Sequence, residues 1–169
     1  RGASPVATSI LQGEDITGVT IMLLDKGLDT GPVLAQEKVS IRADEKCGEL
    51  TGRLFRKGAS LLLTTLDLWK SGDIDPNPQD DLKATTTRRL SREDGKIDWQ
   101  DSSTSILRSI RAFHPWPGTF TYMNGRPLKI LEALQVYEKQ TLVLEPGQVH
   151  IGNEILVGTG EGNISLKTI

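Results

Sequence analysis

The sequence is poor in the residues that build disulfides and metal centres, with one cysteine and two histidines among 169 residues. A single cysteine excludes an intramolecular disulfide and fits a reducing compartment. The neighbours of Cys47 give no sign of an activated thiolate, so we expect this thiol to be inert. Two histidines far apart in the sequence do not favour a zinc site, and no metal ion is expected.

Long hydrophobic runs are absent as well. No segment approaches the length that a membrane-spanning helix requires, and the first residues lack the charged-then-apolar pattern of a signal peptide. Hydrophobic residues make up 37% of the sequence and charged residues 25%, as is typical of a soluble globular protein. The length allows one ordinary domain or two small ones, and we expect no membrane partner.

The net charge of −2 hides an asymmetry between the two parts of the sequence. Residues 1–81 carry 9 basic and 13 acidic side chains, whereas residues 82–169 carry 11 basic and 9 acidic ones. The second part is therefore mildly basic, which is compatible with a modest contact to a polyanion.

The stretch 18–32 is the most informative part of the sequence for function. An uncharged aliphatic run, 19–24, is typical of a strand buried on both faces. Turn-forming residues follow over 25–32, and a second strand is predicted over 33–41. A carboxylate on a loop between two strands is fixed on one side and faces solvent or ligand on the other. We therefore interpret Asp29, on this loop, as the candidate catalytic residue.

Two other interpretations of Asp29 stay open. An Asp that precedes Thr-Gly often only accepts hydrogen bonds from nearby backbone amides, which would make it structural. Asp-Thr-Gly is also the triplet of aspartic proteases, in which two carboxylates share one proton. Here the triplet follows Gly27 and Leu28 and precedes Pro32, unlike the flanks of a protease, and a one-lobed protease would have to dimerise.

A long amphipathic helix is predicted over 44–69, after a short helix over 5–12. Asp44 can cap the start of the long helix and Gly72 stands just past its end, while Gly58 is a candidate break. The apolar residues of this helix recur at three- and four-residue steps and are expected to face the core: Leu50, Leu54, Phe55, Leu61, Leu62, Leu66 and Trp69.

A domain boundary is predicted at 73–87, a linker rich in Asp and Pro. The first domain then covers 1–72 and the second covers 88–169. In the second domain we predict a helix capped by Ser102, followed by short strands separated by turns, including an Asn-Gly pair at 124–125. Strands of such length and spacing predict a small OB-like β-barrel: 119–123, 128–134, 147–151, 155–157 and 164–167.

Five short segments stand out in order along the chain: Arg1-Gly-Ala-Ser-Pro5, Gly18-Val-Thr-Ile-Met22, Leu28-Asp-Thr-Gly31, Asp94-Gly-Lys-Ile-Asp-Trp99 and Arg111-Ala-Phe-His-Pro-Trp-Pro-Gly118. Each segment alone is weak evidence for membership of a protein family. Together, they resemble the methionyl-tRNA formyltransferase family over essentially the whole chain. Other folate-dependent formyltransferases, including those that act on nucleotide-linked amino sugars, look similar through the Asp-Trp and Pro-Trp-Pro-Gly segments.

The resemblance implies an α/β plus all-β fold, with a partial Rossmann-like formyltransferase domain followed by an OB-like barrel. It implies transfer of a formyl group from 10-formyltetrahydrofolate to the amino group of methionyl-initiator tRNA. Asp29 matches the catalytic Asp of the family, which would position a water, orient a histidine and relay protons. The loop that matches the pterin-binding stretch of the family, through its backbone, consists of Leu24, Asp25, Lys26, Gly27 and Leu28.

The catalytic Asn and His of the family lie upstream of the matching segments, and neither His114 nor His150 corresponds to that histidine. We therefore expect the chain to be the C-terminal portion of a formyltransferase, without the front of its catalytic domain and inactive alone. The complete protein is expected to be a monomer in the bacterial cytoplasm or in an organelle.

Basic residues of the second part are candidate phosphate contacts to tRNA: Arg88, Arg89, Lys96, Arg108 and Arg111. The alternative is an ordinary solvated, charged face. Trp99 and Trp116 could stack on bases, but we expect them to anchor the linker and the helix against the barrel. A free-standing, non-catalytic nucleic-acid-binding module of the OB type remains an alternative to the enzyme.

Overall fold

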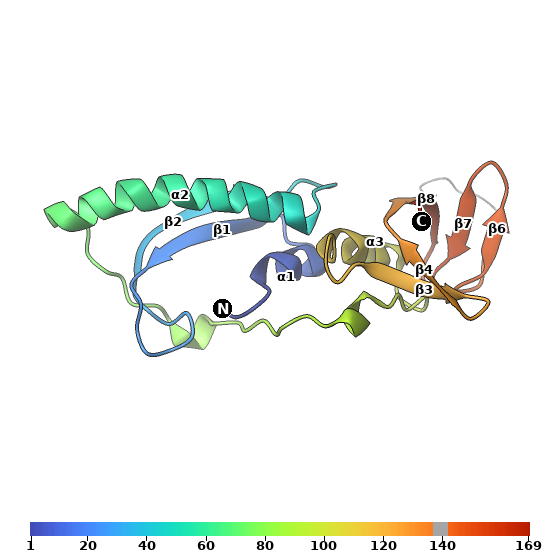
Figure 1. The fold of residues 1–169 in the computed structure, drawn as a ribbon, viewed down its shortest axis with the longest axis horizontal. Helices are drawn as coiled ribbons and strands as arrows, with labels where there is room; N and C mark the ends of the chain where they lie inside the picture. Colours follow the sequence, from blue (N-terminus) through green and yellow to red (C-terminus); the bar gives the residue numbers. More distant parts are fainter. Residues whose placement is uncertain (137–141) are drawn as a thin grey trace. The chain divides into compact units, whose positions relative to one another are not determined.

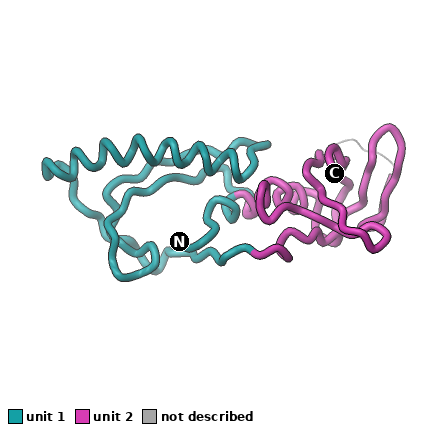
Figure 2. Tube along the Cα trace, in the orientation of Figure 1, with its two compact units in different colours: residues 1–9, 13–90 teal, residues 10–12, 91–169 magenta. Residues whose placement is uncertain are grey.

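The computed structural model describes residues 1–136 and 142–169. Their contacts divide the chain into two compact units (Figure 2): unit 1, residues 1–9 and 13–90, and unit 2, residues 10–12 and 91–169. The order of helices and strands along the chain can be followed in Figure 1. No helix of the described ranges is both long enough and apolar enough to cross a membrane.

Unit 1 is built on an antiparallel strand pair and one long helix. The short helix α1 (Pro5–Gln12) precedes β1 (Ile16–Met22), which pairs with β2 (Val33–Ser40). The helix α2 (Cys47–Ser71) follows and contacts both strands (Figure 1). α1 begins at a proline, as predicted, because the first residue of a helix needs no intrahelical N–H donor.

The prediction that the first strand is buried on both faces is wrong. Exposed and half-buried residues alternate along β1, and Val39 of β2 is the only residue of either strand that is buried. α2 packs against this pair, and a two-stranded antiparallel pair with one covered face can leave its other face to solvent. The aliphatic run was therefore an unreliable sign of burial.

α2 runs without interruption past Gly58, contrary to the predicted break. A Cβ atom at this position would lie 3.1 Å from Cγ1 of Val19, so the glycine allows the helix to approach β1 closely. The helix begins after Lys46, whose amide donates to the Glu49 carboxylate at 3.2 Å, and not at the predicted cap Asp44. Its end is as predicted, because Gly72 has a left-handed backbone with φ of 79°.

The predicted core face of α2 is only partly buried. Leu50 and Leu54 are buried, but Phe55 is 76% exposed. Towards the end of the helix, Leu62 and Trp69 are exposed as well. A helix of this length extends about 37 Å, whereas strands of seven or eight residues extend about 25 Å, so the strands cannot cover its whole length.

Unit 2 packs one helix against short antiparallel strands. The helix α3 (Ser103–Ala112) begins as predicted at Ser102, whose hydroxyl accepts the amide of Ser105 at 3.2 Å. Its buried residues Ile106 and Ile110 form one cluster with residues from three strands and the preceding segment: Ile97, Ile130, Val157 and Ile164. The strands of unit 2 are β3 (Thr119–Met123), β4 (Arg126–Ile130), β5 (Glu132–Gln135), β6 (Val149–Ile151), β7 (Ile155–Gly158) and β8 (Asn163–Thr168).

The described strands do not close into a barrel, so the OB-like barrel is not confirmed. β3 and β4 form a separate two-stranded sheet, and the other strands form a sheet in the order β5-β8-β7-β6. The strand predicted over 128–134 is interrupted at Leu131, where the chain leaves its pairing with β3 and joins β8. The predicted Asn-Gly turn is confirmed, because Asn124 and Gly125 have φ of 52° and 75°.

An ion pair fixes the start of α2 to the end of β2. The buried carboxylate of Glu45 accepts Nε and Nη2 of Arg53 at 2.8 and 2.6 Å and the amide of Arg42 at 3.2 Å. Nη2 of Arg53 also donates to the carbonyl of Ser40 at 2.7 Å. The hydrogen bonds from Arg53, followed by that from Arg42, hold the pKa of Glu45 below its ordinary value of 4.5.

We expect Glu45→Gln to lower the free energy of unfolding at pH 7 by roughly 1–3 kcal/mol, since it leaves the guanidinium without its charged partner. Because the folded-state pKa of Glu45 lies below the ordinary one, its stabilisation is complete above pH 4.5 and is lost as the pH falls through the folded-state value. Urea unfolding at neutral pH and at progressively lower pH should show the difference between wild type and variant shrinking. Glu14→Gln, at an exposed position, is the control, and a difference that does not change with pH would contradict the assignment.

Candidate active site around Asp29

The loop between β1 and β2 is closed at its base by backbone contacts. The amide of Leu23 donates to the carbonyl of Pro32 at 3.0 Å, one step beyond the ladder of the two strands. Gly31 is buried, and a Cβ atom built on it would lie 1.7 Å from the carbonyl oxygen of Leu23. The closure of this loop therefore admits no side chain at position 31.

Asp25 organises the first half of the loop. Its Oδ1 accepts the hydroxyl of Thr30 at 2.7 Å and the amide of Gly27 at 2.9 Å. These bonds, the one from Thr30 first, lower the pKa of the Asp25 carboxyl, because they stabilise its charged form. Asp25 therefore has the structural role that the sequence analysis considered for Asp29, because it accepts hydrogen bonds from its own turn.

Asp29 is held differently from Asp25. Its backbone is left-handed, with φ of 55°, a conformation that few residues other than glycine adopt and that is found disproportionately at functional sites. Its Oδ2 accepts the amide of Gly2 at 2.9 Å, from a segment distant in sequence. Its Oδ1 has no hydrogen-bond partner within residues 1–136 and 142–169, so a half-buried carboxylate is oriented through one oxygen and leaves the other available.

The carboxamide of Gln79 clamps the loop at Asp29. Nε2 of Gln79 donates to the carbonyl oxygens of Asp29 and Gly31, at 3.0 and 2.6 Å. Oε1 of the same side chain accepts Nη2 of Arg1 at 3.3 Å, and that guanidinium also pairs with Asp81 at 2.7 Å. The sequence analysis missed Gln79 and Arg1, because nothing in the local pattern indicates contacts across fifty or more residues.

The first residues lie against Thr87 in unit 1. The amide of Thr87 donates to the carbonyl of Arg1 at 2.8 Å, and its hydroxyl accepts the amide of Ser4 at 3.0 Å. Gly2 has φ of 104°, and a Cβ atom there would lie 2.4 Å from the carbonyl oxygen of Thr87. Three segments therefore meet at Asp29: the first residues, the β1–β2 loop and the stretch that leads to Thr87 (Figure 1).

The candidate folate-binding loop lies directly beside Asp29. Leu24 is 91% exposed and Leu28 is 66% exposed, and the three residues between them are exposed as well. Apolar side chains and backbone polar groups are thus accessible together on a loop whose shape Asp25 maintains.

The basic residues predicted to contact tRNA are divided between the two units. Arg88 and Arg89 are exposed in unit 1, and Lys96 is exposed in unit 2. Arg108 and Arg111 lie half-buried on α3.

The two tryptophans considered for stacking differ in burial. Nε1 of Trp99 donates to the hydroxyl of Thr121 at 3.0 Å, and its ring packs on the core cluster of unit 2, so it is an anchor as expected. Trp116 is 59% exposed, and the prediction that it anchors the linker is wrong. His114 and His150 both lie in unit 2, on the turn before Trp116 and on the exposed strand β6.

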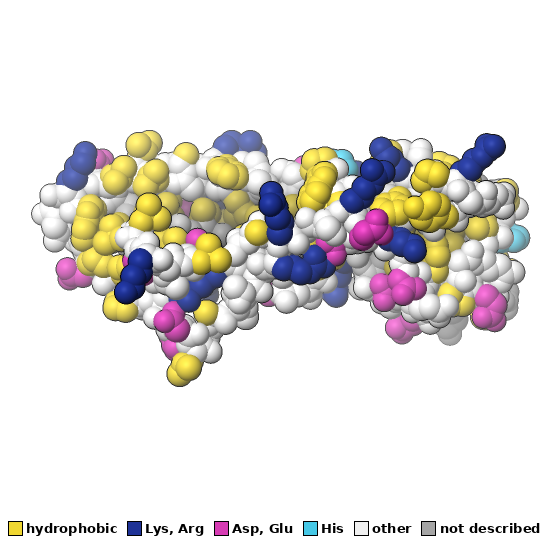
Figure 3. Space-filling view, turned by 60° about the horizontal axis from the view of Figure 1, so that its bottom comes forward, with side chains coloured by type: hydrophobic (Ala, Val, Ile, Leu, Met, Phe, Trp, Pro, Cys, Tyr) yellow, Lys and Arg dark blue, Asp and Glu magenta, His cyan; other side chains and the backbone are white. Residues whose placement is uncertain are grey.

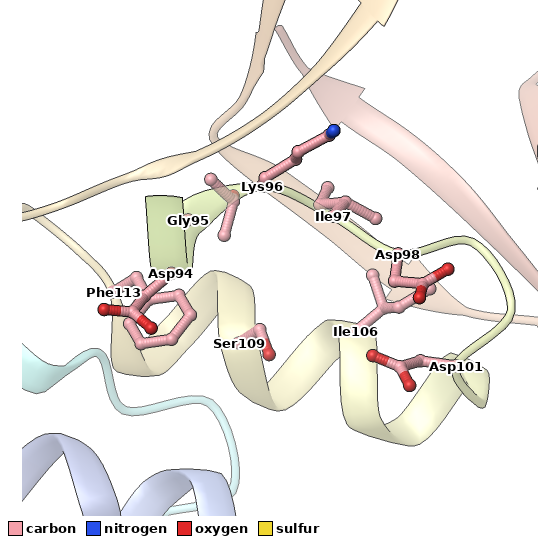
Figure 4. A pocket seen from close by; sticks show the side chains of 10 residues that line it. Asp94, Gly95, Lys96, Ile97, Asp98, Asp101, Ile106, Ser109 and Phe113 are labelled. Carbon is pink, nitrogen blue, oxygen red and sulfur yellow. The ribbon is translucent and has the colours of Figure 1, made fainter. Parts of the chain in front are cut away.

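Unit 2 also contains a small cavity of about 130 Å³ over α3 (Figure 4). Carboxylates of Asp94, Asp98 and Asp101 line it, together with the apolar side chains of Ile106 and Phe113. Asp94 is engaged there, because its Oδ2 accepts the amide and the hydroxyl of Ser91. No group of three or more metal-binding side chains occurs in the part of the chain that the structure describes.

We expect Gly31→Ala to lower the free energy of unfolding of unit 1 by roughly 2 kcal/mol or more, because the new methyl group collides with the Leu23 carbonyl. Gly52→Ala is the matched control: a Cβ atom on this helical glycine would meet only Nη1 of Arg56 at 3.8 Å, an ordinary van der Waals contact, so the change should be neutral or slightly stabilising. Chemical unfolding of the two variants measures the change in the free energy of unfolding, which we expect to be a loss for Gly31→Ala and none or a small gain for Gly52→Ala. Equal effects would show that the loop can move aside at position 31.

Two family models match the chain, and between them they cover most of it. The model described as formyl transferase matches residues 1–66. The model described as formyl transferase, C-terminal domain, matches residues 89–169.

Several curated relatives are named methionyl-tRNA formyltransferase. A methionyl-tRNA formyltransferase from Chloroflexus aurantiacus is 50% identical over 79% of this chain and 43% of its own length. One from Roseiflexus castenholzii is 45% identical over 100% of this chain and 54% of its own length. The chain therefore spans about half the length of the curated relatives that it matches.

Solved structures share the fold. The N-formyltransferase from Helicobacter canadensis, determined in complex with folinic acid and dTDP-3-aminofucose, superposes with a TM-score of 0.77 at 20% identity. The superposition covers 99% of this chain and 61% of that protein. With both family models matched and relatives at 45–50% identity, the chain belongs to the formyl transferase family.

Proposed function

We propose that this chain is part of an enzyme that transfers a formyl group from 10-formyltetrahydrofolate to the amino group of methionyl-initiator tRNA. The names of the curated relatives and their identity of 45–50% support the tRNA-linked acceptor. The folinic acid bound to the Helicobacter canadensis neighbour supports a folate as the formyl donor. We propose that the reaction uses no metal ion.

The chemistry requires a group that manages a proton. The amine of the methionyl ester attacks the formyl carbon, which gives a tetrahedral intermediate with an oxyanion and a protonated amine. The amine must then lose a proton, and the C–N bond to the folate must break while the folate nitrogen gains one. A carboxylate near the reacting carbon can accept the first proton, directly or through a water, and help to return one to the leaving nitrogen.

Asp29 is the residue that we propose for this role, and the geometry of its carboxylate carries the proposal. Oδ2 is fixed by the amide of Gly2, while Oδ1 is available to a water, to an imidazole or to the substrate amine. The left-handed backbone of Asp29, clamped by Gln79, keeps the carboxylate in place as charge develops. The histidine that the family resemblance implies as a partner would come from outside the chain described here.

The loop 24–28 is the proposed folate-binding segment, because it presents exposed apolar side chains and backbone groups next to Asp29. The basic residues at 88–89 and on unit 2 are proposed as phosphate contacts. We also propose that residues 1–72 belong to the catalytic domain and residues 88–169 to a tRNA-binding domain. Such an enzyme would act wherever translation begins with formylmethionine, in bacteria or in organelles.

A second acceptor is favoured by one specific observation. The neighbour from Helicobacter canadensis, whose structure holds dTDP-3-aminofucose, covers 99% of this chain. An amino sugar linked to a nucleotide is therefore the alternative acceptor, and Asp29 would serve the same proton transfer there.

The test is formyl transfer by a chimera of this chain and the part of the Roseiflexus castenholzii relative that it does not match, with the chain alone measured in parallel. With 10-formyltetrahydrofolate as donor, we expect charged initiator tRNA to be formylated by the chimera. Asp29→Asn should lower kcat by about a hundred-fold or more, since it removes the proton acceptor while keeping the shape and the bond to Gly2.

Asp67→Asn, on the exposed side of α2, is the matched control and should keep full activity. Unchanged activity of Asp29→Asn would overturn the role of Asp29. Preferential transfer to a dTDP-linked amino sugar would establish the alternative acceptor. Activity of the chain alone would mean that its own residues supply the whole catalytic set.

A further inference from the structure

The β3–β4 hairpin of unit 2 has an outward face that carries aromatic and basic side chains. Directly opposed residues in an antiparallel pair project from the same face. The register opposes Phe120 to Lys129 and Tyr122 to Pro127, so these four side chains share one face. Tyr122, Pro127 and Lys129 are exposed, and Phe120 is half-buried.

The opposite face of the hairpin is the one that packs into unit 2. Ile130 is buried, and Leu128 packs against the core cluster. Thr121, opposed to Leu128, accepts the indole N–H of Trp99 at 3.0 Å. The face with Phe120 and Tyr122 therefore has a fixed orientation, because turning it inward would expose this core-facing set.

A second lysine lies on the other side of Phe120. Lys96 forms a parallel bridge with Phe120, and the next residue, Ile97, donates its amide to the Phe120 carbonyl at 2.8 Å. Ile97 is buried, so Lys96 projects outward beside Phe120. A row of Lys96, Phe120 and Lys129 thus crosses three adjacent segments, which are spaced about 4.8 Å apart.

The two lysines of this row are exposed and have no ion-pair partner within the ranges that the structure describes. Lys96 borders the small cavity together with Asp94 and Asp98, its nearest acidic neighbours in sequence, and Asp98 accepts the amide of Gln100 at 3.0 Å. Figure 4 shows Lys96 pointing away from these carboxylates. The positive charges are thus available to an anionic partner.

The two aromatic rings of this hairpin face, those of Phe120 and Tyr122, lie in contact with each other. The ring centroids of Phe120 and Tyr122 are 5.9 Å apart, with their planes at 82°. Tyr122 remains 56% exposed, so much of its ring has no partner on this hairpin. Hydrophobic and basic side chains lie side by side over the part of the molecule that carries β3 and β4 (Figure 3).

We propose that this face is a binding site for unpaired nucleotides of a single RNA strand. A base stacks on Tyr122 beside Phe120, and the flanking phosphates contact the ammonium groups of Lys96 and Lys129. Aromatic side chains between cations are the combination that binds single strands, because every base has a face to stack while the phosphates carry the charge. The proposal rests on the proposed function only in taking the tRNA substrate as the natural source of the strand.

Binding of a labelled oligouridylate of about ten nucleotides to the full chain, followed by fluorescence anisotropy, tests the site. Tyr122→Leu should weaken binding about ten-fold, whereas Tyr122→Phe, which keeps the ring, should bind like wild type. Lys129→Gln should weaken binding at low salt and lower the slope of log K against log salt by about 0.7.

Phe55→Leu and Lys70→Gln, which make comparable changes at exposed positions of α2, are the matched controls and should leave binding unchanged. A base-free sugar–phosphate oligomer separates the two contributions, since its binding should respond to Lys129→Gln but not to Tyr122→Leu. Far-ultraviolet circular dichroism of each variant shows that the fold is kept.

No binding of the oligouridylate, equal binding by Tyr122→Leu and wild type, or equal competition by duplex RNA would each overturn the proposal. The assay involves no formyl transfer and no folate. Its failure would therefore leave the proposed reaction standing, and failure of formyl transfer would leave this result interpretable.

Discussion

The carboxamide of Gln79 is the contact on which the arrangement of unit 1 around Asp29 depends. The β1–β2 ladder ends before the loop, so the carbonyl groups of Asp29 and Gly31 accept no hydrogen bond from the ladder. A single side-chain amide donates to both and at the same time accepts from Arg1. Backbone carbonyl groups that lose water without gaining a hydrogen bond are costly. The Gln79 amide satisfies these two carbonyl groups, as the backbone amides of a paired strand would.

The two aspartates of the loop show how one carboxylate can be structural and another available for chemistry. One oxygen of Asp25 accepts hydrogen bonds from two donors of its own turn, and these bonds lower the pKa of its carboxyl group. Asp29 accepts from a distant segment and keeps one oxygen without a described partner. Both residues are aspartates of the same loop, so the backbone conformation and the contacts separate their roles.

The sequence predicted the features that depend on neighbouring residues. Ser102 as a helix cap, Gly72 at a helix end and the Asn-Gly turn were all recognisable, because a few adjacent residues determine them. The position of Asp29 on a loop between two strands was found in the same way. The clamp by Gln79 could not be predicted, since it joins residues fifty positions apart.

The wrong predictions, of burial in β1 and α2 and of a barrel in unit 2, also share a cause: each depends on contacts between distant parts of the chain. Apolar patterns indicate which residues could be buried, but burial depends on what lies opposite, so β1 and the end of α2 are more exposed than predicted. The barrel prediction assumed one continuous strand over 128–134, whereas the chain changes partner at Leu131. Strand length and spacing carry no information about such a change of partner.

That change of partner at Leu131 separates β3 and β4 from the larger sheet, and it has an evolutionary consequence. Along the hairpin, alternate positions belong to the hydrophobic core and to the solvent-facing surface. The outward positions can therefore diversify among relatives while the inward ones stay under selection for folding. The hairpin is thus a module in which recognition and stability are encoded at interleaved positions and can evolve independently.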